Sequence, residues 1–380
     1  MIGLDLIGAT VLVPDEGLVP RRLSFAEGRI VADPVGRRVD LSGCLILPGI
    51  VDLHGDGFER HVAPRRGAMT DPEEGIVTAA TELAVNGITT GVLAQFYSWE
   101  GGLRGPEFAA RVFAAIAAAR SRVVPDLIPQ LRFEVALLDD YAALPGMLAD
   151  WGIPYLVFND HLAHDRLAAG RKPPRLTGQA LKAGCNPEAY FERMLALEAR
   201  MAEVPSALER LCAALAGQGV RMGSHDDRAR DARDDWRGRG VQIAEFPETW
   251  VAAEAAREGG DAVIMGAPNV MRGGSHNGNV SARELVLAGL CDALASDYHY
   301  PSLRRAAWSL AEEIGIARAW ELVSSGPVRV LGLSDRGRLH PGLRADLLIV
   351  EAATGRVVGV FAEGRVAHLV GDFAGRFLMA

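Results

Sequence analysis

Apolar runs alternate with turn residues at both ends of the chain, a pattern typical of short β-strands. The predicted strands, separated by Pro-Asp-Glu-Gly, Glu-Gly and other glycine-rich turns, are Val11–Val13, Arg22–Phe25, Arg29–Val31, Ala345–Val350, Val357–Phe361 and Arg365–Val370. Because two β-rich ends enclose a middle of different character, we predict that residues 1–47 and 337–380 meet in one small β-sandwich domain.

The middle of the chain alternates between helical spacing and short apolar runs. Helices are predicted at 71–86, 106–120, 187–215 and 282–289. Strands are predicted at 50–53, 88–93, 130–138, 156–158, 220–224, 241–244, 262–266 and 293–296. Short strands that alternate with helices predict an α/β fold, a parallel (β/α)8 TIM barrel over residues 48–336.

Bulk properties restrict the partners that we expect for this 380-residue chain. Its formal net charge of −8 argues against nucleic-acid binding, because neutralising phosphates requires basic patches. No apolar run approaches the ~20 residues of a membrane helix, and the N-terminus lacks the pattern of a signal peptide. The four cysteines lie far apart, which fits reduced thiols. We therefore expect a cytoplasmic protein without a membrane or nucleic-acid partner.

A candidate metal motif follows the first predicted barrel strand, where an apolar run ends in His54-Gly55-Asp56. Because side chains alternate with a period of two along a strand, His54 and Asp56 are predicted to project from one face. An imidazole and a carboxylate in this arrangement suit a divalent metal. An isolated pair of this kind also fits a core histidine followed by a turn aspartate.

Further polar residues fall at the carboxyl ends of other predicted strands, where the chemistry of an α/β barrel is found. These residues are His225 with Asp226 and Asp227, Glu245, and Asp297, and Glu134 is a further charge within the otherwise apolar strand predicted at 130–138. Buried charges are costly unless they are paired or bound to a metal. The recurrence of such residues favours a metal site over a network of ion pairs without metal.

Six strings of residues carry a family likeness. They are H-G-D-G-F-E-R-H at 54–61, G-S-H-D-D at 223–227, A-E-F-P-E-T at 244–249, M-G-A-P-N-V-M-R-G-G-S-H-N-G-N-V at 265–280, S-D-Y at 296–298 and G-x-R-A-D-L-L-I-V at 342–350. Together they resemble the amidohydrolase superfamily and, within it, the ribose 1-methylphosphonate 5-triphosphate diphosphatases of phosphonate metabolism. The resemblance implies a metal-dependent barrel flanked by a β-sandwich. The chain departs from the family pattern at Gly57 and at 159–164, which lacks a Pro-Gly-Gln segment.

The resemblance also implies a set of metal ligands. Many amidohydrolases bridge two metals with a carboxylated lysine, but Lys172 and Lys182, the only lysines, lie away from the predicted strand ends. We therefore expect His54 and Asp56 to hold one metal and Glu134 to bridge or cap it. One or two divalent ions per chain are expected. Zinc is favoured, and manganese or iron suit the same ligands.

The other polar residues at strand ends are candidates for further metal ligands, for a partner of the histidine ligand and for the general base. His225 is expected to be a ligand from the other side, and Glu245 is either a ligand or an acid paired with an arginine. Asp226 and Asp227 either fix the tautomer of His225 or form a solvated acidic turn. Asp297 is predicted to be the general base that takes a proton from metal-bound water, whose pKa the cation lowers to about 7. The alternative for Asp297 is a helix N-cap.

A substrate with several phosphates needs guanidinium groups and backbone amides that match phosphate oxygens. The candidates are Arg65 and Arg66, which follow the metal motif, and Arg272, which lies in the glycine-rich string at 265–280. His276 is expected to contact the substrate or to be a further ligand. His299 is a lesser candidate, for which surface placement is the alternative.

Three functions follow from these features. The leading one, which the resemblance implies and the arginine and glycine-rich features favour, is a hydrolase that releases pyrophosphate from a ribose 5-triphosphate phosphonate, with a metal-bound hydroxide as the nucleophile. The second is an amidohydrolase or deaminase for an amide, cyclic imide or nucleobase, which the missing Pro-Gly-Gln favours. The third is a non-catalytic subunit of a phosphonate assembly, which predicts no stoichiometric metal. A small phosphorylated molecule is the expected partner, and a homodimer is compatible with an acidic barrel that exposes an Ala-rich helix.

Overall fold

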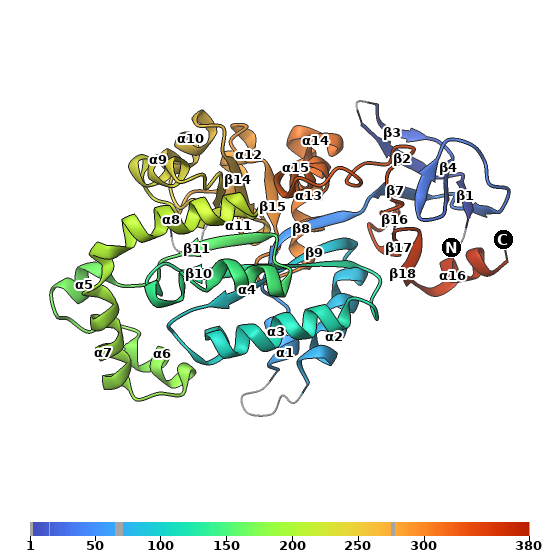
Figure 1. Cartoon of the computed structure of the whole chain (residues 1–380). Helices are drawn as coiled ribbons and strands as arrows, with labels where there is room; N and C mark the ends of the chain where they lie inside the picture. The colour runs from blue at the N-terminus through green and yellow to red at the C-terminus, as the bar shows by residue number, and fades with distance from the viewer. Residues whose placement is uncertain (1–2, 15, 65–70, 275–277, 380) are drawn as a thin grey trace. The chain divides into compact units, whose positions relative to one another are not determined.

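A computed structural model of the chain (Figure 1) describes residues 3–14, 16–64, 71–274 and 278–379. The chain divides into two compact units. The first unit comprises Met1–Leu93, Ala118–Ile128 and Val263–Ala380, and the second comprises Ala94–Ala117 and Pro129–Ala262.

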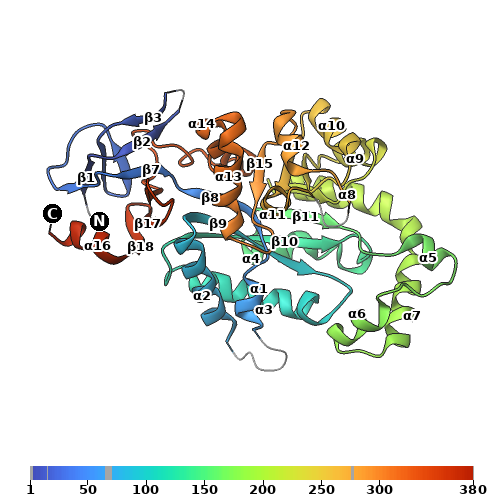
Figure 2. The same cartoon turned by 180° about the vertical axis from the view of Figure 1, so that it is seen from behind.

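Strands from both ends of the chain form two sheets in the first unit. A four-stranded sheet has the order β5-β4-β1-β6, and a six-stranded sheet has the order β18-β17-β16-β7-β2-β3. The bounds are β1 Leu4–Ile7, β2 Thr10–Val13, β3 Gly17–Pro20, β4 Leu23–Ala26, β5 Arg29–Val31, β6 Arg38–Asp40, β7 Cys44–Pro48, β16 Leu347–Glu351, β17 Val357–Ala362 and β18 Arg365–Leu369. Leu348 of β16 is opposite Leu47 of β7, so the two chain ends meet in one sheet as predicted (Figures 1 and 2).

An eight-stranded parallel sheet forms the barrel, in the order β15-β14-β13-β12-β11-β10-β9-β8. Its strands are β8 Ile50–Gly55, β9 Ile88–Tyr97, β10 Asp126–Glu134, β11 Tyr155–Asn159, β12 Arg221–His225, β13 Ile243–Glu245, β14 Ala262–Gly266 and β15 Ala293–Ala295. A parallel bridge between Gly55 and Asp297 joins the end of the first barrel strand to the end of the last. The predicted α/β barrel is therefore confirmed.

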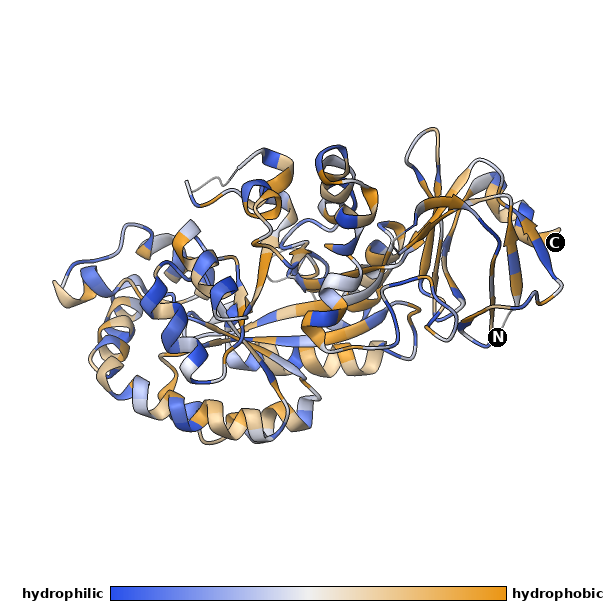
Figure 3. Ribbon diagram, turned by 90° about the horizontal axis from the view of Figure 1, so that it is seen from above, coloured by the Kyte–Doolittle hydropathy of each residue, from blue (hydrophilic) through white to orange (hydrophobic). Residues whose placement is uncertain are grey.

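Helices follow the barrel strands, and their starts carry recognisable caps. The Asp71 side chain accepts from the backbone N–H of Glu73 at 2.9 Å, and the Asn186 side chain accepts from Glu188 at 2.8 Å. The α-helices are α1 Glu59–Val62, α2 Pro72–Val85, α3 Pro106–Ala119, α4 Leu144–Trp151, α5 His164–Ala168, α6 Leu176–Ala183, α7 Pro187–Glu198, α8 Val204–Gly217, α9 Arg230–Gly238, α10 Trp250–Glu258, α11 Ala267–Arg272, α12 Ala282–Leu287, α13 Pro301–Ile314, α14 Ile316–Glu321, α15 Ser325–Leu331 and α16 Gly371–Leu378. Short 3₁₀ turns are η1 Gly102–Arg104, η2 Leu138–Asp140 and η3 Met201–Glu203. Figure 3 shows helices of mixed hydropathy, as expected when each buries one face.

Some predicted bounds were wrong. Strand β10 ends at Glu134, so the strand expected at 130–138 is displaced towards the N-terminus. Val135 and Ala136 are buried in the following turn, and an apolar run alone does not distinguish a strand from a buried turn. The helix expected at 187–215 is divided into α7 and α8. The elements that were not predicted are strands β1, β3 and β6 and helices α1, α4, α5, α6, α11, α13, α14, α15 and α16. Among the helices of the described ranges, none combines the length and the apolar character needed to cross a bilayer.

Candidate active site

In the first unit, the end of β8 places a histidine and an aspartate among buried residues. The side chains of His54 and Asp52 are completely buried. The Asp52 carboxylate accepts hydrogen bonds from Ser296, from its backbone N–H at 2.9 Å and its hydroxyl at 2.5 Å. Burial raises the pKa of Asp52, and the hydrogen bonds from Ser296 oppose that rise. Asp52 therefore links β8 to the end of β15, a role that the sequence interpretation missed.

Main-chain hydrogen bonds bring the predicted metal motif and the predicted general base together. The backbone N–H of Asp297 donates to the carbonyl of His54 at 2.9 Å, and the N–H of Asp56 donates to the carbonyl of Asp297 at 3.0 Å. Asp297 has a φ of 56°, in the left-handed region that non-glycine residues adopt at a cost. This conformation lies at the point where the first and last strands of the barrel meet.

Close packing explains the two glycines of the H-G-D-G string. A Cβ on Gly55 would lie 2.7 Å from a carboxylate oxygen of Asp52 and 2.8 Å from the Tyr300 ring. A Cβ on Gly57 would lie 3.2 Å from the carbonyl oxygen of Tyr298. A glycine is therefore needed at position 55, and at position 57 a side chain would be tightly packed against its neighbours.

In the second unit, β10 ends at Glu134, whose buried carboxylate is held by three donors. The indole N–H of Trp99 and the backbone N–H of His161 each donate to its Oε2 at 3.2 Å. The ring Nδ1 of His161 bonds its Oε1. Burial lowers the pKa of His161, but the hydrogen bond to Glu134 and its negative charge together raise the pKa by more, so the net shift is upward. His161 was not among the predicted site residues, although its place after the end of β11 was a signal.

The surroundings of His225 define its tautomer. Its Nε2 lies 3.0 Å from a guanidinium nitrogen of Arg132. A guanidinium only donates, so Nε2 accepts and the ring proton is assigned to Nδ1. That Nδ1 lies 2.9 Å from a carboxylate oxygen of Asp226. The Arg132 guanidinium also lies 3.9 Å from the centroid of the Phe96 ring, which fixes its position.

Glu245 is brought close to His225 by the strand register. The two residues are direct partners in the pairing of β12 with β13, and a ligand atom of each lies within 4.8 Å of the other. The Glu245 carboxylate is completely buried. It accepts from the hydroxyl of Tyr155 and, at 3.0 Å, from the amide of Gln130.

Two more strand ends in the second unit carry left-handed residues. Asp226 follows β12 with a φ of 64°, and Phe246 follows β13 with a φ of 53°. Backbone conformations of this kind cluster at functional sites, where the surrounding structure enforces them.

The side chain of Asp227 points to other partners than that of Asp226: it contacts Ser224 at 2.6 Å and the buried Arg233 at 2.9 Å. It thus belongs to a structural ion pair.

Two of the five predicted phosphate-binding residues lie on the described surface, and three lie outside the described residues. Arg272 is exposed at the end of α11 and donates to the hydroxyl of Tyr298. His299 is exposed, and its backbone N–H donates to Ser296 at 3.0 Å. Arg65, Arg66 and His276 lie outside the described residues.

The donor chemistry of these strand ends fits a divalent metal. His54, Glu134 and Glu245 are buried imidazole and carboxylate groups, and His225 has an acceptor nitrogen in the assigned tautomer. Imidazole and carboxylate are the usual ligands of zinc, manganese and iron.

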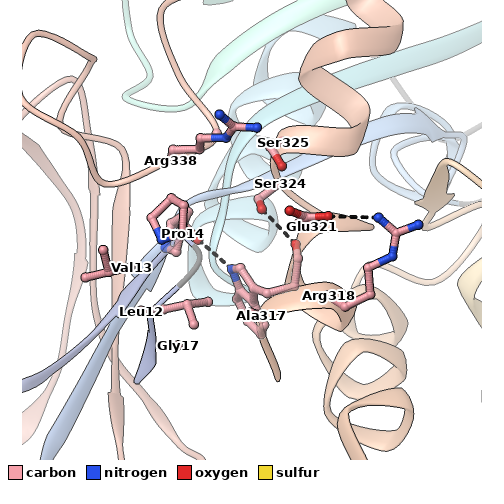
Figure 4. Close-up of a pocket in the computed structure, with 13 residues that line it drawn as sticks. Leu12, Val13, Pro14, Gly17, Ala317, Arg318, Glu321, Ser324, Ser325 and Arg338 are labelled. Carbon is pink, nitrogen blue, oxygen red and sulfur yellow. Dashed lines mark hydrogen bonds and ion pairs between the residues drawn. The ribbon is translucent and has the colours of Figure 1, made fainter. Parts of the chain in front are cut away.

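The first unit contains a pocket that none of these residues lines. It has a volume of about 250 Å³ and is lined from β2, β3, α14 and α15 (Figure 4). Its walls include Leu12, Pro14, Trp320, Glu321 and Arg338, and none of the predicted site residues that the structure describes lines it.

One curated protein provides a close comparison, although no family model matches the chain. The chain is 31% identical over 360 residues to alpha-D-ribose 1-methylphosphonate 5-triphosphate diphosphatase of Escherichia coli (strain K12). The matched region covers 90% of this chain and 94% of that protein.

Solved structures with a similar fold are hydrolases. A prolidase complexed with N-methylphosphonate-L-proline has a TM-score of 0.65 at 13% identity, covering 97% of this chain and 100% of that chain. The beta-aspartyl dipeptidase of Fervidobacterium islandicum AW-1 has a TM-score of 0.63 at 14% identity, covering 97% of both chains. The N-acyl-D-glutamate deacylase of Bordetella bronchiseptica, complexed with zinc and a phosphonate inhibitor, has a TM-score of 0.59 at 16% identity, covering 96% of both. At these identities the likeness shows the fold.

Proposed function

Because this chain belongs to the family of alpha-D-ribose 1-methylphosphonate 5-triphosphate diphosphatases, we propose that it hydrolyses a ribose 5-triphosphate phosphonate and releases pyrophosphate. The observation that supports this proposal is a similarity that extends over nearly the whole length of both chains. The strand-end imidazole and carboxylate groups provide the chemistry that such a hydrolysis needs.

The proposal assigns metal ligation to imidazole and carboxylate groups at strand ends. The proposed ligands are His54, Asp56, Glu134, His225 and Glu245. When bound, a divalent cation lowers the pKa of water and offsets the charge that develops on phosphoryl oxygens. Asp226 would hold the Nδ1 proton of His225, from which it lies 2.9 Å. Zinc is our preferred cation, and manganese and iron are the alternatives.

Asp297 is the proposed general base. The water oxygen attacks the α-phosphorus, and the bond between that phosphorus and the oxygen of the departing pyrophosphate breaks. Asp297 takes the proton that the attacking water loses. Its backbone is fixed on both sides by bonds to His54 and Asp56, which supports a defined position for the carboxylate.

Binding of the triphosphate is assigned to arginine and histidine side chains. Arg272 and His299 are exposed and can offer positive or hydrogen-bonding groups to phosphate oxygens. Arg65, Arg66 and His276, which lie outside the described residues, complete the proposal.

The test is a direct assay of the purified, metal-loaded protein with the ribose 5-triphosphate phosphonate. We expect stoichiometric pyrophosphate and the 5-phosphate product. Release of inorganic phosphate alone, or no release of either, contradicts the diphosphatase. A parallel panel of amides, cyclic imides and purines tests the C–N hydrolase alternative through release of ammonia or a new carboxylate.

Elemental analysis separates an enzyme from a non-catalytic subunit. If the protein is the diphosphatase, we expect one or two equivalents of divalent metal per chain; if it is a non-catalytic subunit, we expect none.

We also propose that the protein forms a homodimer and is located in the cytoplasm. Light scattering of the purified protein would test the first, and fractionation of cells would test the second.

A further inference from the structure

The pocket of Figure 4 continues into a wider hollow on the first unit. The hollow has a volume of about 790 Å³, and Val13, Pro14, Ser325 and Arg338 line both spaces. Strand β2 supplies Val13, and helix α15 begins at Ser325. None of the strand-end residues discussed above lines either space.

The walls of the combined cavity carry a surplus of positive charge. Three of its arginines are neutralised in ion pairs: Arg21 with Glu16, Arg318 with Glu321, and Arg336 with Asp335 and Asp126. Two exposed arginines remain. Arg329 contacts only the hydroxyl of Ser325, at 3.5 Å, and Arg338 has no hydrogen bond or ion pair, each counted over the described residues. Two guanidinium groups without a carboxylate partner suit a ligand with two negative charges.

The smaller space adds an apolar wall. Leu12, Val13 and Pro14 line it from one side, and Ala317 and Trp320 line it from the helices (Figure 4). The indole N–H of Trp320 donates to the carbonyl of Pro48 at 3.0 Å, so the one polar group of this buried side chain is satisfied and the part of the ring that lines the space is apolar. An apolar group of a ligand would contact this wall while an anionic group reaches Arg338.

We propose that this cavity binds a small dianion that carries an apolar or ring substituent, such as a phosphate monoester or an organic phosphonate. Arg338 and Arg329 bind the dianion, and the hydroxyl of Ser325 accepts or donates a further hydrogen bond. The substituent packs against Trp320 and Leu12. The site is separate from the residues that we assign to hydrolysis, so it does not depend on that assignment.

Calorimetric titration of the full-length protein with phenyl phosphate, methylphosphonate and inorganic phosphate tests the site. The variants are Arg338→Gln and Arg329→Gln. The control is Arg305→Gln, which removes one exposed positive charge from α13, where the described residues show no contact of Arg305 with the cavity. Sodium chloride at matched ionic strength controls for general screening.

We expect saturable binding that is tightest for phenyl phosphate, because that probe fills the apolar wall as well. Loss of one charge-assisted contact should weaken binding roughly tenfold or more in Arg338→Gln, with Arg305→Gln unchanged. A second variant, Leu12→Ala, should weaken phenyl phosphate and leave inorganic phosphate unaffected. The proposal is overturned if no probe binds saturably in the millimolar range, or if all three arginine variants bind alike.

Discussion

Replacing Asp297 with asparagine separates a role in proton transfer from a role in folding. Asparagine has nearly the same shape as aspartate and tolerates the left-handed region that the φ of 56° requires. The two hydrogen bonds that join residue 297 to His54 and Asp56 involve only the main chain, at 2.9 and 3.0 Å, and are retained. The substitution removes the negative charge of the side chain and, with it, the ability to take a proton.

The two roles predict different magnitudes. Loss of a general base lowers kcat by about 10²- to 10⁴-fold, which corresponds to roughly 3–5 kcal/mol of activation free energy. The free energy of unfolding should change far less, by about 1 kcal/mol or less, because the shape of the side chain and the backbone conformation are retained. Asp297→Ala should be less stable than Asp297→Asn, by about 1 kcal/mol, because alanine tolerates the left-handed conformation less well.

The assay measures pyrophosphate release by metal-loaded protein, together with the unfolding midpoint in urea. Asp372→Asn, which neutralises an exposed carboxylate on α16, is the matched control for the change in net charge. If Asp297→Asn retains activity within threefold of the control, residue 297 is not the base. If the alanine and asparagine variants unfold at the same urea concentration, the argument from backbone conformation is wrong.

Four further predictions concern the metal, a buried ion pair, a histidine and a buried hydroxyl. Chelation followed by dialysis should abolish pyrophosphate release, and added zinc or manganese should restore it; undiminished turnover by metal-free protein would contradict the metal site. Arg233→Ala leaves the buried carboxylate of Asp227 without its arginine partner at 2.9 Å, whereas Asp261 keeps Arg237 at 2.7 Å, so urea denaturation should show a loss of about 3–5 kcal/mol. Hydrogen bonding to Asp160 raises the pKa of His164 from 6.5 to about 9, so its contribution to stability is complete below pH 6.5 and is lost as the pH rises through about 9. His164→Gln should therefore cost roughly 1 kcal/mol at pH 6, a value discounted for the 41% exposed side chain, and nothing at pH 10.5; an equal cost at both pH values would refute this. Tyr300→Phe removes a buried hydroxyl that has no hydrogen-bond partner among the described residues, so thermal unfolding should show unchanged or higher stability, by up to about 1 kcal/mol, and a lower midpoint would count against it.

Local patterns were sufficient to predict most of the barrel. Strands that are buried on both faces appear in the sequence as continuous apolar runs, and β14 has the bounds that its run at 262–266 predicted. The prediction failed where this signal is ambiguous. The apolar run after Glu134 is buried in a turn, so the end of β10 was placed four residues too late. The four-residue strand β3 is only partly buried and carries little periodic signal.

The sequence allowed individual candidate residues of the site to be named, but not the contacts between them. A polar group at the end of an apolar run is visible in the sequence, and His54, His225, Glu245 and Asp297 were named as candidates in this way, with Glu134 as a charge inside a predicted strand. Their partners were not. The roles of Asp52 and His161 became visible only through hydrogen bonds to Ser296 and Glu134, residues that lie 244 and 27 positions away in the chain.

The sequence by itself therefore determined the alternation of strands and helices and the presence of acids and imidazoles at strand ends. These features are local, because burial and hydrogen-bonding requirements act on each segment as it stands. Only the tertiary structure decided which donor faces which acceptor: Arg132 against Nε2 of His225, Tyr155 against Glu245, and the Asp297 main chain against His54. Those pairings depend on strand order and register, which join residues far apart in the chain and leave no periodic trace in the sequence.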